Sequence, residues 1–408
     1  MTTTKTAKLI LKKFEERRLL QGHLWVFSNE VERLRGEADN GDIIEVYDSA
    51  NQMVGHALYN KNSLIAARML GKHYNGDFYE YIFRSLADAM ALREEMYPRR
   101  KSFRLSFSES DFLPGLIIDK YNDTYVLQVY SYGMQKNIDT IVEVLKTEFE
   151  AENIFTLNDT YFRVLEGLEV KDDVYLGSIG EEVIDDGSIR YKVKFDTAQK
   201  TGFYFDQCDN REFIEKLVPA KSVLDAFCNS GGFGLHAAYA GASEVTFVDI
   251  SQTEVDNAKY NFELNGFSTP AEYFRFDVFG FLRRCKKEGK KFDVVVIDPP
   301  AFTKSKKTVD VAIKGYTKIN KLAMMIIKDN GYLVTSSCSH HIKRSDFADA
   351  LKLSAMKARR TVQLVHQSGA AMDHPQLPAM DETTYLKFAV FRIVGGASQQ
   401  VDEDDADD

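Results

Sequence analysis

The stretch Val223–Phe233, with the sequence VLDAFCNSGGF, decides the fold of this 408-residue chain. It predicts a short apolar strand, a turn that contains Gly231 and Gly232, and the beginning of a helix. Glycines in such a turn allow the backbone to approach a ligand closely. The next apolar strand ends in Asp249, eighteen residues after Gly231, and an acid near that spacing is placed to accept hydrogen bonds from ribose hydroxyls. On its own the glycine pair is weak evidence for a nucleotide site.

Two further acids follow this unit along the chain. Asp277 comes after the segment Tyr273–Phe276 and is placed to contact an adenine amine. Asp298 ends the apolar run Val294–Ile297 and begins an Asp-Pro-Pro turn, at the sheet edge where folds of this type bind ligands. In this order the glycine turn, the acids and Asp-Pro-Pro resemble the pattern of class I S-adenosylmethionine methyltransferases. The resemblance implies S-adenosylmethionine as the cofactor, held by residues of this pattern: Asp225, Phe227, Gly231, Gly232, Asp249, Asp277 and Asp298.

The apolar runs of the C-terminal half indicate a parallel sheet. Four runs lack polar alternation, as is typical of strands covered on both faces: 222–224, 244–248, 292–297 and 332–335. A helix is expected over residues 252–265, ended by Gly266 in a left-handed conformation. We therefore expect an α/β fold, with a Rossmann-like class I methyltransferase domain over residues 190–394. The turn lacks the Gly-x-Gly-x-x-Gly fingerprint, which argues against a nicotinamide dehydrogenase.

The first half of the chain has a different pattern. Residues 42–47 predict a strand and residues 53–59 its hairpin partner. Residues 1–73 are therefore expected to form a small β-rich domain. A helix over residues 78–97 then begins a region of mixed strands and helices, which predicts an α+β middle domain over residues 74–189.

The net charge of −9 at first argues against an RNA partner. The last seven residues carry six of the negative charges, and removing them leaves a net charge of −3. Basic residues cluster within the ranges 99–104, 283–291 and 304–307. Because local basic patches determine phosphate binding, the acidic total does not exclude RNA, although each run taken singly is more often a solvated face. The acidic segment 395–408 is expected to be a disordered tail.

The cysteines and the apolar segments bear on the cellular compartment. The four cysteines show neither Cys-x-x-Cys nor a cysteine–histidine ligand spacing, which predicts no disulfide framework and no metal site. A reducing cytosol is the better expectation for such a chain. Residues 1–13 lack a signal-peptide core, and no segment approaches the ~18 apolar residues that a membrane span needs. We therefore expect a cytoplasmic protein without a membrane partner.

Cys338 is the most informative single residue. It follows an apolar strand, between Ser337 and Ser339, forty residues after Asp298. Carbon 5 of cytosine is too electron-poor to attack a methyl sulfonium directly, but a thiolate added to carbon 6 makes carbon 5 nucleophilic. Asp298 is the candidate acid at the ring nitrogen N3. The alternative is a buried thiol that only packs, and Cys228, within the glycine turn, is the rival thiol.

The chain resembles, over nearly all its length, the bacterial 23S ribosomal RNA cytosine-5 methyltransferase I family. Residues 12–27 (KKFEERRLLQGHLWVF) resemble the opening of that family's PUA module, an RNA-binding fold, and residues 104–119 its second domain. The most family-specific segment is 199–207 (QKTGFYFDQ), and residues 373–375 and 385–387 match as well. The resemblance implies that four residues of that segment help to cradle the cofactor: Lys200, Gly202, Phe203 and Asp206.

Two departures limit the resemblance. Other RNA cytosine-5 methyltransferases have a second cysteine directly after the Asp-x-Pro turn, where this chain has Ala301. Cys338 is thus implied as the sole nucleophile, and the base that removes the carbon 5 proton stays open. Cys208 stands where the family usually has arginine, with Arg211 nearby.

The resemblance implies an enzyme that uses S-adenosylmethionine to form 5-methylcytosine in 23S ribosomal RNA or a large-subunit precursor, and it suggests a homodimer. Two alternatives stay open. One is a methyltransferase that acts on another RNA base without a thiol, because related families share Asp-Pro-Pro. The other is a non-catalytic RNA-binding assembly factor. The target nucleotide does not follow from the sequence.

Overall fold

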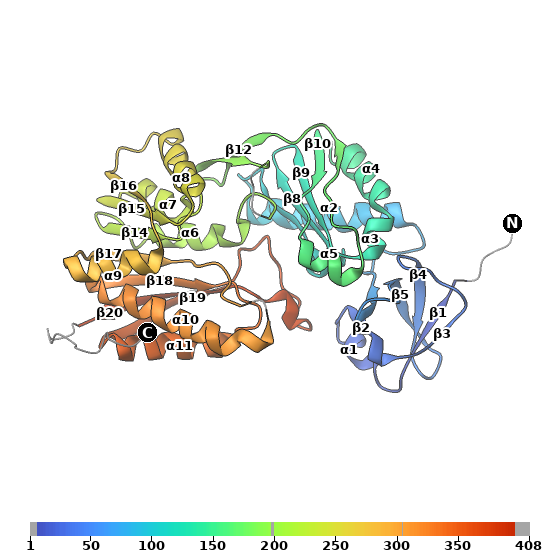
Figure 1. Cartoon of the computed structure of the whole chain (residues 1–408). Helices are drawn as coiled ribbons and strands as arrows, with labels where there is room; N and C mark the ends of the chain where they lie inside the picture. Colours follow the sequence, from blue (N-terminus) through green and yellow to red (C-terminus); the bar gives the residue numbers. More distant parts are fainter. Residues whose placement is uncertain (1–5, 197–199, 304, 396–408) are drawn as a thin grey trace. The chain divides into compact units, whose positions relative to one another are not determined.

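A computed structural model describes residues 6–196, 200–303 and 305–395 (Figure 1). The chain divides into two compact units. Unit 1 contains Met1–Gly187, Val193–Asp206 and Ala371–Thr383, and unit 2 contains the remaining residues. Gln199, Lys304 and the acidic tail from residue 396 lie outside the described residues. The predicted domain boundaries at residues 73 and 189 stay predictions.

The first part of unit 1 is a six-stranded sheet with the order β2-β6-β5-β4-β1-β3. Its neighbouring strands are antiparallel except for the parallel pair β1 and β4. The predicted hairpin is confirmed, with Ile44 opposite Ala57 in a core of aliphatic side chains. Its elements are β1 (Lys8–Leu11), α1 (Glu16–Leu20), β2 (Trp25–Phe27), η1 (Ser28–Glu30), β3 (Val31–Arg35), β4 (Ile43–Tyr47), β5 (Met53–Tyr59) and β6 (Ile65–Met69).

The second part of unit 1 is a five-stranded sheet with the order β11-β10-β9-β8-β7. The predicted long helix is confirmed as α2, which is capped by Asp77, whose side chain accepts a bond from the Glu80 amide. Helices α2 and α4 pack on the sheet through a shared apolar core. The elements are α2 (Phe78–Met96), β7 (Phe103–Phe107), η2 (Ser108–Asp111), β8 (Leu116–Tyr121), β9 (Thr124–Val129), α3 (Tyr132–Lys136), α4 (Ile138–Glu148), β10 (Asn153–Thr156), α5 (Thr160–Glu166) and β11 (Val174–Leu176).

A buried arginine joins these two parts of unit 1. Arg68, on β6, pairs with Glu109 of η2 and with Glu166 of α5, each at 2.8 Å. The Trp25 indole also donates to Glu109 (2.7 Å), and the Ser63 hydroxyl donates to Glu166 (2.9 Å). All three charged side chains are at most one tenth exposed. The charges are therefore balanced within the protein rather than by water.

A segment from late in the sequence completes unit 1. Asp373 accepts a bond from the Arg104 amide (2.9 Å), and its own carbonyl accepts one from the Arg93 guanidinium (2.7 Å). His374 bonds to the Asp373 carboxylate (2.6 Å) and packs against Phe107. Burial raises the pKa of Asp373, but His374, the Arg104 amide and Arg93 together lower it below its ordinary value. Residues 371–383 are thus built into unit 1 by buried polar contacts.

Unit 2 is centred on a seven-stranded sheet with the order β16-β15-β14-β17-β18-β20-β19. Strands β14 to β18 are parallel, and β20 is antiparallel to both β18 and β19. The elements are α6 (Cys208–Ile214), β14 (Ser222–Ala226), α7 (Gly232–Tyr239), β15 (Glu244–Asp249), α8 (Gln252–Leu264), β16 (Ala271–Arg275), α9 (Val278–Glu288), β17 (Phe292–Ile297), η4 (Lys306–Thr308), α10 (Val309–Met325), β18 (Ile327–Ser337), α11 (Arg344–Lys357), β19 (Thr361–Ser368) and β20 (Lys387–Val394).

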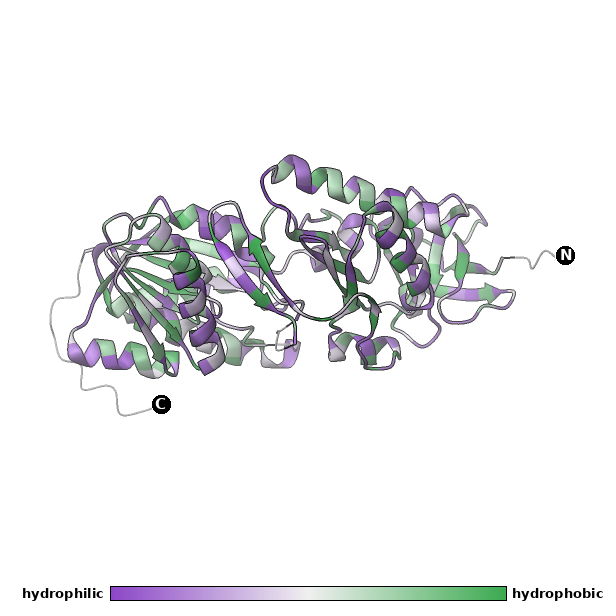
Figure 2. Cartoon of the chain, turned by 90° about the horizontal axis from the view of Figure 1, so that it is seen from above, coloured by the Kyte–Doolittle hydropathy of each residue, from purple (hydrophilic) through white to green (hydrophobic). Residues whose placement is uncertain are grey.

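The predicted parallel sheet and its covering helices are confirmed. The inner strands are almost wholly buried, and Figure 2 shows them as apolar arrows beside helices that carry hydrophilic stretches. Helix α8 ends before Gly266, and the φ of +67° at this glycine confirms the predicted left-handed cap. Short elements at the junctions of the two units are β12 (Glu181–Asp185), β13 (Arg190–Lys194) and η3 (Phe205–Gln207), with η5 (Asp381–Thr383) in the late segment. Within the described residues, every helix is too short or too polar to cross a membrane.

Candidate active site

The predicted site residues of unit 2 gather at one edge of its sheet. Asp225 lies in β14, Asp249 ends β15, and Asp298 and Cys338 directly follow β17 and β18. These four strands are neighbours and parallel, so their carboxyl ends share one edge. The strand order reverses between β14 and β17, and open α/β sheets bind ligands at such a switch point.

The turn after β14 has an unusual backbone. Phe227, Asn229 and Gly231 all have positive φ, at 64°, 48° and 91°. Residues other than glycine seldom have a positive φ, and those that do tend to occur at ligand sites. The turn is tied to the next strand, because the amides of Phe227 and Cys228 both donate to the Val248 carbonyl (2.9 and 3.1 Å).

The glycines of this turn are required by close packing as well as by backbone angles. A Cβ on Gly231 would lie 3.1 Å from Ala258, and one on Gly232 would lie 2.5 Å from the Arg211 side chain. The tightest position is Gly234, where a Cβ would lie 2.2 Å from the Phe247 ring. Sequence reasoning missed Gly234, although its place three residues after Gly231 signals the same tight start of a helix.

Three carboxylates make this edge electrostatically negative. Asp225 is buried and accepts a bond from the Gly234 amide (2.8 Å). Burial raises the pKa of Asp225 to about 7; the charges of Asp298 and Asp249 act in the same direction, whereas the Gly234 amide and Arg211 oppose the increase. Asp249 accepts bonds from the amides of Asn229 (3.1 Å) and Ser251 (2.9 Å). A carboxyl group whose pKa is raised by folding destabilises the folded protein as the pH increases from the group's ordinary pKa toward the raised pKa. A bound cation would offset this cost, so a cationic ligand suits this edge.

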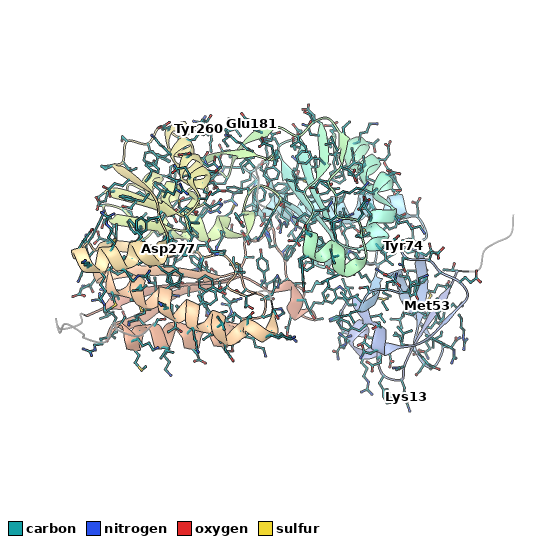
Figure 3. All side chains as sticks on the ribbon, viewed as in Figure 1. Lys13, Met53, Tyr74, Glu181, Tyr260 and Asp277 are labelled. Atoms are coloured by element: carbon teal, nitrogen blue, oxygen red, sulfur yellow. The ribbon has the colours of Figure 1, made fainter. Side chains whose placement is uncertain are left out.

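The other predicted cofactor residues follow β16, the parallel neighbour of β15, or belong to unit 1. Asp277 follows β16 and is exposed at the start of α9, where its carboxylate accepts a bond from the Gly280 amide (2.7 Å; Figure 3). The remaining four belong to unit 1: Lys200, Gly202, Phe203 and Asp206.

Their own surroundings in unit 1 are well defined. Gly202 has φ +119°, and a Cβ there would lie 2.9 Å from Val193. The Phe203 amide donates to the Tyr121 hydroxyl (2.9 Å), which in turn donates to the Thr201 carbonyl (3.0 Å). This segment therefore has a fixed backbone within unit 1.

The structure brings Asp298 and Cys338 together. The Asp298 Oδ1 accepts bonds from the Gln207 amide group (3.0 Å) and from the Ser336 hydroxyl. The Cys338 Sγ lies 3.9 Å from the carbonyl oxygen of Pro299, the residue after Asp298. The predicted nucleophile thus lies against the Asp-Pro-Pro turn. Ser336 could have been anticipated, because side chains two apart in a strand lie on one face, whereas Gln207 is too distant in sequence.

Polar and aromatic groups surround the thiol. The Tyr316 hydroxyl bonds to the Ser339 hydroxyl (3.0 Å), and Phe302 packs on the Tyr316 ring with centroids 4.6 Å apart. Phe302 is therefore partly buried by its neighbours. His340 is exposed and stacks on Tyr385, with centroids 5.2 Å apart.

The match to known proteins extends along the chain. Residues 178–392 match the S-adenosylmethionine-dependent methyltransferase family, and residues 9–72 match the PUA-like domain family. The ribosomal RNA large subunit methyltransferase I of Aliivibrio fischeri strain MJ11 is 38% identical over 395 residues, which cover 95% of this chain and all of that protein. The protein of the same name from Aeromonas hydrophila is 37% identical, over 95% of this chain and 99% of its own.

The chain belongs to the ribosomal RNA large subunit methyltransferase I family. It is an S-adenosylmethionine-dependent methyltransferase with an N-terminal PUA-like domain, as the sequence predicted. Two solved structures share its fold. SMU.776, solved with SAH, has a TM-score of 0.80 at 19% identity, and a methyltransferase from Streptococcus mutans has 0.78 at 20%. Each covers 94% of this chain and 99% of its own.

The residues at the sheet edge of this methyltransferase fit its cofactor. The donor carries a sulfonium, an ammonium and a carboxylate, and its two cationic groups suit an edge that holds the acidic side chains of Asp225, Asp249 and Asp298. Its ribose hydroxyls can donate hydrogen bonds to a carboxylate such as Asp249. The turn of residues 227–231, with three positive φ angles, lies at the end of β14.

Proposed function

We propose that this methyltransferase forms 5-methylcytosine in 23S ribosomal RNA, with Cys338 as covalent nucleophile and Asp298 as acid. The observation that carries the proposal is the adjacency of these groups. The thiol lies against the Asp-Pro-Pro turn on the strand next to β17. Strand β17 is itself next to β14, which leads into the glycine turn. A nucleophile is thus available beside the methyl donor's expected position.

The chemistry assigns each group a balanced step. The Cys338 thiolate forms a bond to carbon 6 of cytosine, and the ring electron pair moves toward N3, where Asp298 supplies a proton. When bound, S-adenosylmethionine would supply an electrophilic methyl group: carbon 5 bonds to it, its bond to the sulfonium sulfur breaks, and SAH is the leaving group. The N3 proton returns to Asp298. A base removes the proton from carbon 5, and the bond from carbon 6 to sulfur breaks. We assign no residue to that base.

Asp298 is held in a fixed orientation for this role. Its Oδ1 receives two hydrogen bonds, from Gln207 on the helix side and Ser336 on the strand side. Two donors on one oxygen restrain the movement of the carboxyl group. We therefore propose that the same two residues orient the carboxyl group of Asp298 toward the cytosine ring.

We also propose that the cofactor is bound by the residues to which the two sequence resemblances assign that role. Asp249 provides the sharpest test. Asp249→Asn keeps the size of the side chain but removes its charge and one acceptor. Loss of a hydrogen bond to a charged group costs about 1.5–3 kcal/mol, so SAH is expected to bind roughly 10- to 100-fold more weakly. Isothermal titration calorimetry checks this.

The control for that titration is Asp256→Asn, an exposed acid on α8. It is expected to leave the SAH affinity unchanged. Equal affinities of the Asp249→Asn variant and the unaltered protein, with equal thermal midpoints, would remove Asp249 from the cofactor site.

An RNA partner is supported by more than the names of relatives. Helix α10 follows the Asp-Pro-Pro loop and carries Lys314, Lys318 and Lys321, with the first two exposed. Their spacing of four and three residues places them on one face of the helix, which suits a phosphate backbone. The PUA-like domain is the second proposed RNA contact. Because the proposed substrate is ribosomal RNA, we propose that the protein is located in the cytoplasm. The homodimer stays a prediction.

Nucleoside mass spectrometry tests the function directly. The protein is incubated with labelled S-adenosylmethionine and either protein-free 23S ribosomal RNA or large-subunit precursors. The expected product of nuclease digestion is labelled 5-methylcytidine at one position, with one of the two substrates preferred. Label in an adenosine, a guanosine or an exocyclic methylcytidine would overturn the cytosine-5 assignment.

A further inference from the structure

Lys387, the first residue of β20, is a buried cation next to the candidate nucleophile. It is only 4% exposed, and it pairs in register with Ser337, the residue before Cys338. Its ammonium donates to the carbonyl of Ser339, the residue after Cys338, at 2.7 Å. The lysine therefore contacts the chain on both sides of the thiol.

The other contacts of Lys387 leave its charge without a close anion. The ammonium donates a second bond to the Tyr385 carbonyl (2.7 Å). An ammonium has three N–H donors, and the two bonds that Lys387 makes to Ser339 and Tyr385 both go to neutral carbonyl groups. Across the part of the chain that the structure describes, no carboxylate lies within ion-pair distance of Lys387. A buried ammonium without an anionic partner is costly.

The surrounding charges point to Cys338 as the missing partner. Burial lowers the pKa of Lys387 to about 8, while interaction with Cys338 opposes that decrease. From α11, Arg344 lowers the pKa and Asp346 raises it. Tyr316, on α10, also interacts electrostatically with Cys338, and burial raises the pKa of that tyrosine.

We propose that Lys387 is the counter-cation of Cys338, held beside the sulfur so that the thiol is present as a thiolate before cytosine binds. It is a positioning residue, because it acts through the sulfur. The thiol proton leaves to water, Lys387 keeps its three protons, and the sulfur lone pair then forms the bond to carbon 6. When that bond breaks, the electron pair returns to the sulfur beside the same cation. The role in methylation rests on the proposed function, whereas the ion pair does not.

The pH dependence of alkylation tests the ion pair without RNA or cofactor. The full-length protein is treated with iodoacetamide across a pH series, and modification of each cysteine is measured by peptide mass spectrometry. Burial raises the thiol pKa of Cys228 and of Cys285, so both are expected to react slowly. For Cys338 we expect a midpoint at least about one pH unit below the ~8.5 of a free cysteine.

Three variants isolate the charge. Lys387→Met is expected to raise the Cys338 midpoint by about one to two pH units, and so to slow alkylation at pH 6.5 by roughly 10- to 100-fold. Lys387→Arg keeps a cation and is expected to keep the low midpoint. Lys352→Met removes an exposed cation on α11, so its midpoint should match that of the unaltered protein.

Thermal unfolding and SAH titration establish that each variant is folded. A Cys338 midpoint at or above ~8.5 in the unaltered protein overturns the proposal, and this result does not depend on any variant. A low midpoint that persists in folded Lys387→Met also overturns it. If the midpoints behave as expected but no covalent complex with RNA forms, the ion pair stands and the cytosine-5 function fails.

Discussion

Cys338→Ala is expected to abolish the covalent complex that the unaltered protein forms with RNA containing 5-fluorocytosine. Fluorine replaces the carbon 5 proton that must leave, so the bond from sulfur to carbon 6 stays intact after methyl transfer. Without the thiol no such bond can form. Methyl transfer to ordinary RNA should fall on the order of 10³-fold or more, as for the loss of a covalent nucleophile. Denaturing gel electrophoresis of labelled RNA detects the complex.

Cys285→Ala is the matched control for this experiment. Cys285 is a buried thiol on α9, within the apolar core of unit 2, and the complex should form as in the unaltered protein. The Cys338→Ala variant must also bind SAH normally, which shows that the glycine turn is intact. A covalent complex that persists in Cys338→Ala would assign the nucleophile to another residue. Full methylation by Cys338→Ser would favour chemistry without a covalent intermediate.

Arg68→Met is expected to destabilise unit 1 by about 3–5 kcal/mol. The substitution leaves Glu109 and Glu166 buried without their shared cation, and breaking a buried ion pair by removing one partner costs about this much. Chemical denaturation of the full-length protein measures the loss, and the tryptophan signal is informative because Trp25 bonds directly to Glu109. The chain has a single tryptophan, so its fluorescence reports on this cluster.

Arg284→Met provides the comparison. Arg284 pairs with Glu288 on α9 at 2.8 Å, but both side chains are about half exposed, and such exposed pairs contribute little to stability. If the two substitutions had equal effects on unfolding, the Arg68 cluster would not be a buried ion-pair network in the native protein.

Much of unit 2 could be predicted from the sequence because its signals are local. The glycine turn, the apolar runs and Asp298 each lie within a short segment, and a parallel sheet then places their ends at one edge. Cys338 and Asp298 were predicted forty residues apart, and the adjacency of β17 and β18 brings them together.

The partners of these residues could not be predicted in the same way. Gln207 bonds to Asp298 across about ninety residues of sequence, and Lys387 reaches Ser339 across forty-eight. Each contact depends on a long-range pairing of elements, for which a single sequence carries no periodic signal. The Arg68 cluster is similar, because a buried charge looks like a surface charge until its partners are known.

The late segment of unit 1 has a consequence for synthesis on the ribosome. The chain changes between the two units at five points, and residues 371–383 return to unit 1 after nearly all of unit 2 has been made. The carbonyl of Asp373 accepts a hydrogen bond from the Arg93 guanidinium, and its carboxylate accepts one from the Arg104 amide. Both arginines are translated roughly 270 residues earlier. Domains usually fold in order as they leave the ribosome. Here the contacts of Asp373 with the Arg93 guanidinium and the Arg104 amide can form only after residues 207–370 of unit 2 have been made.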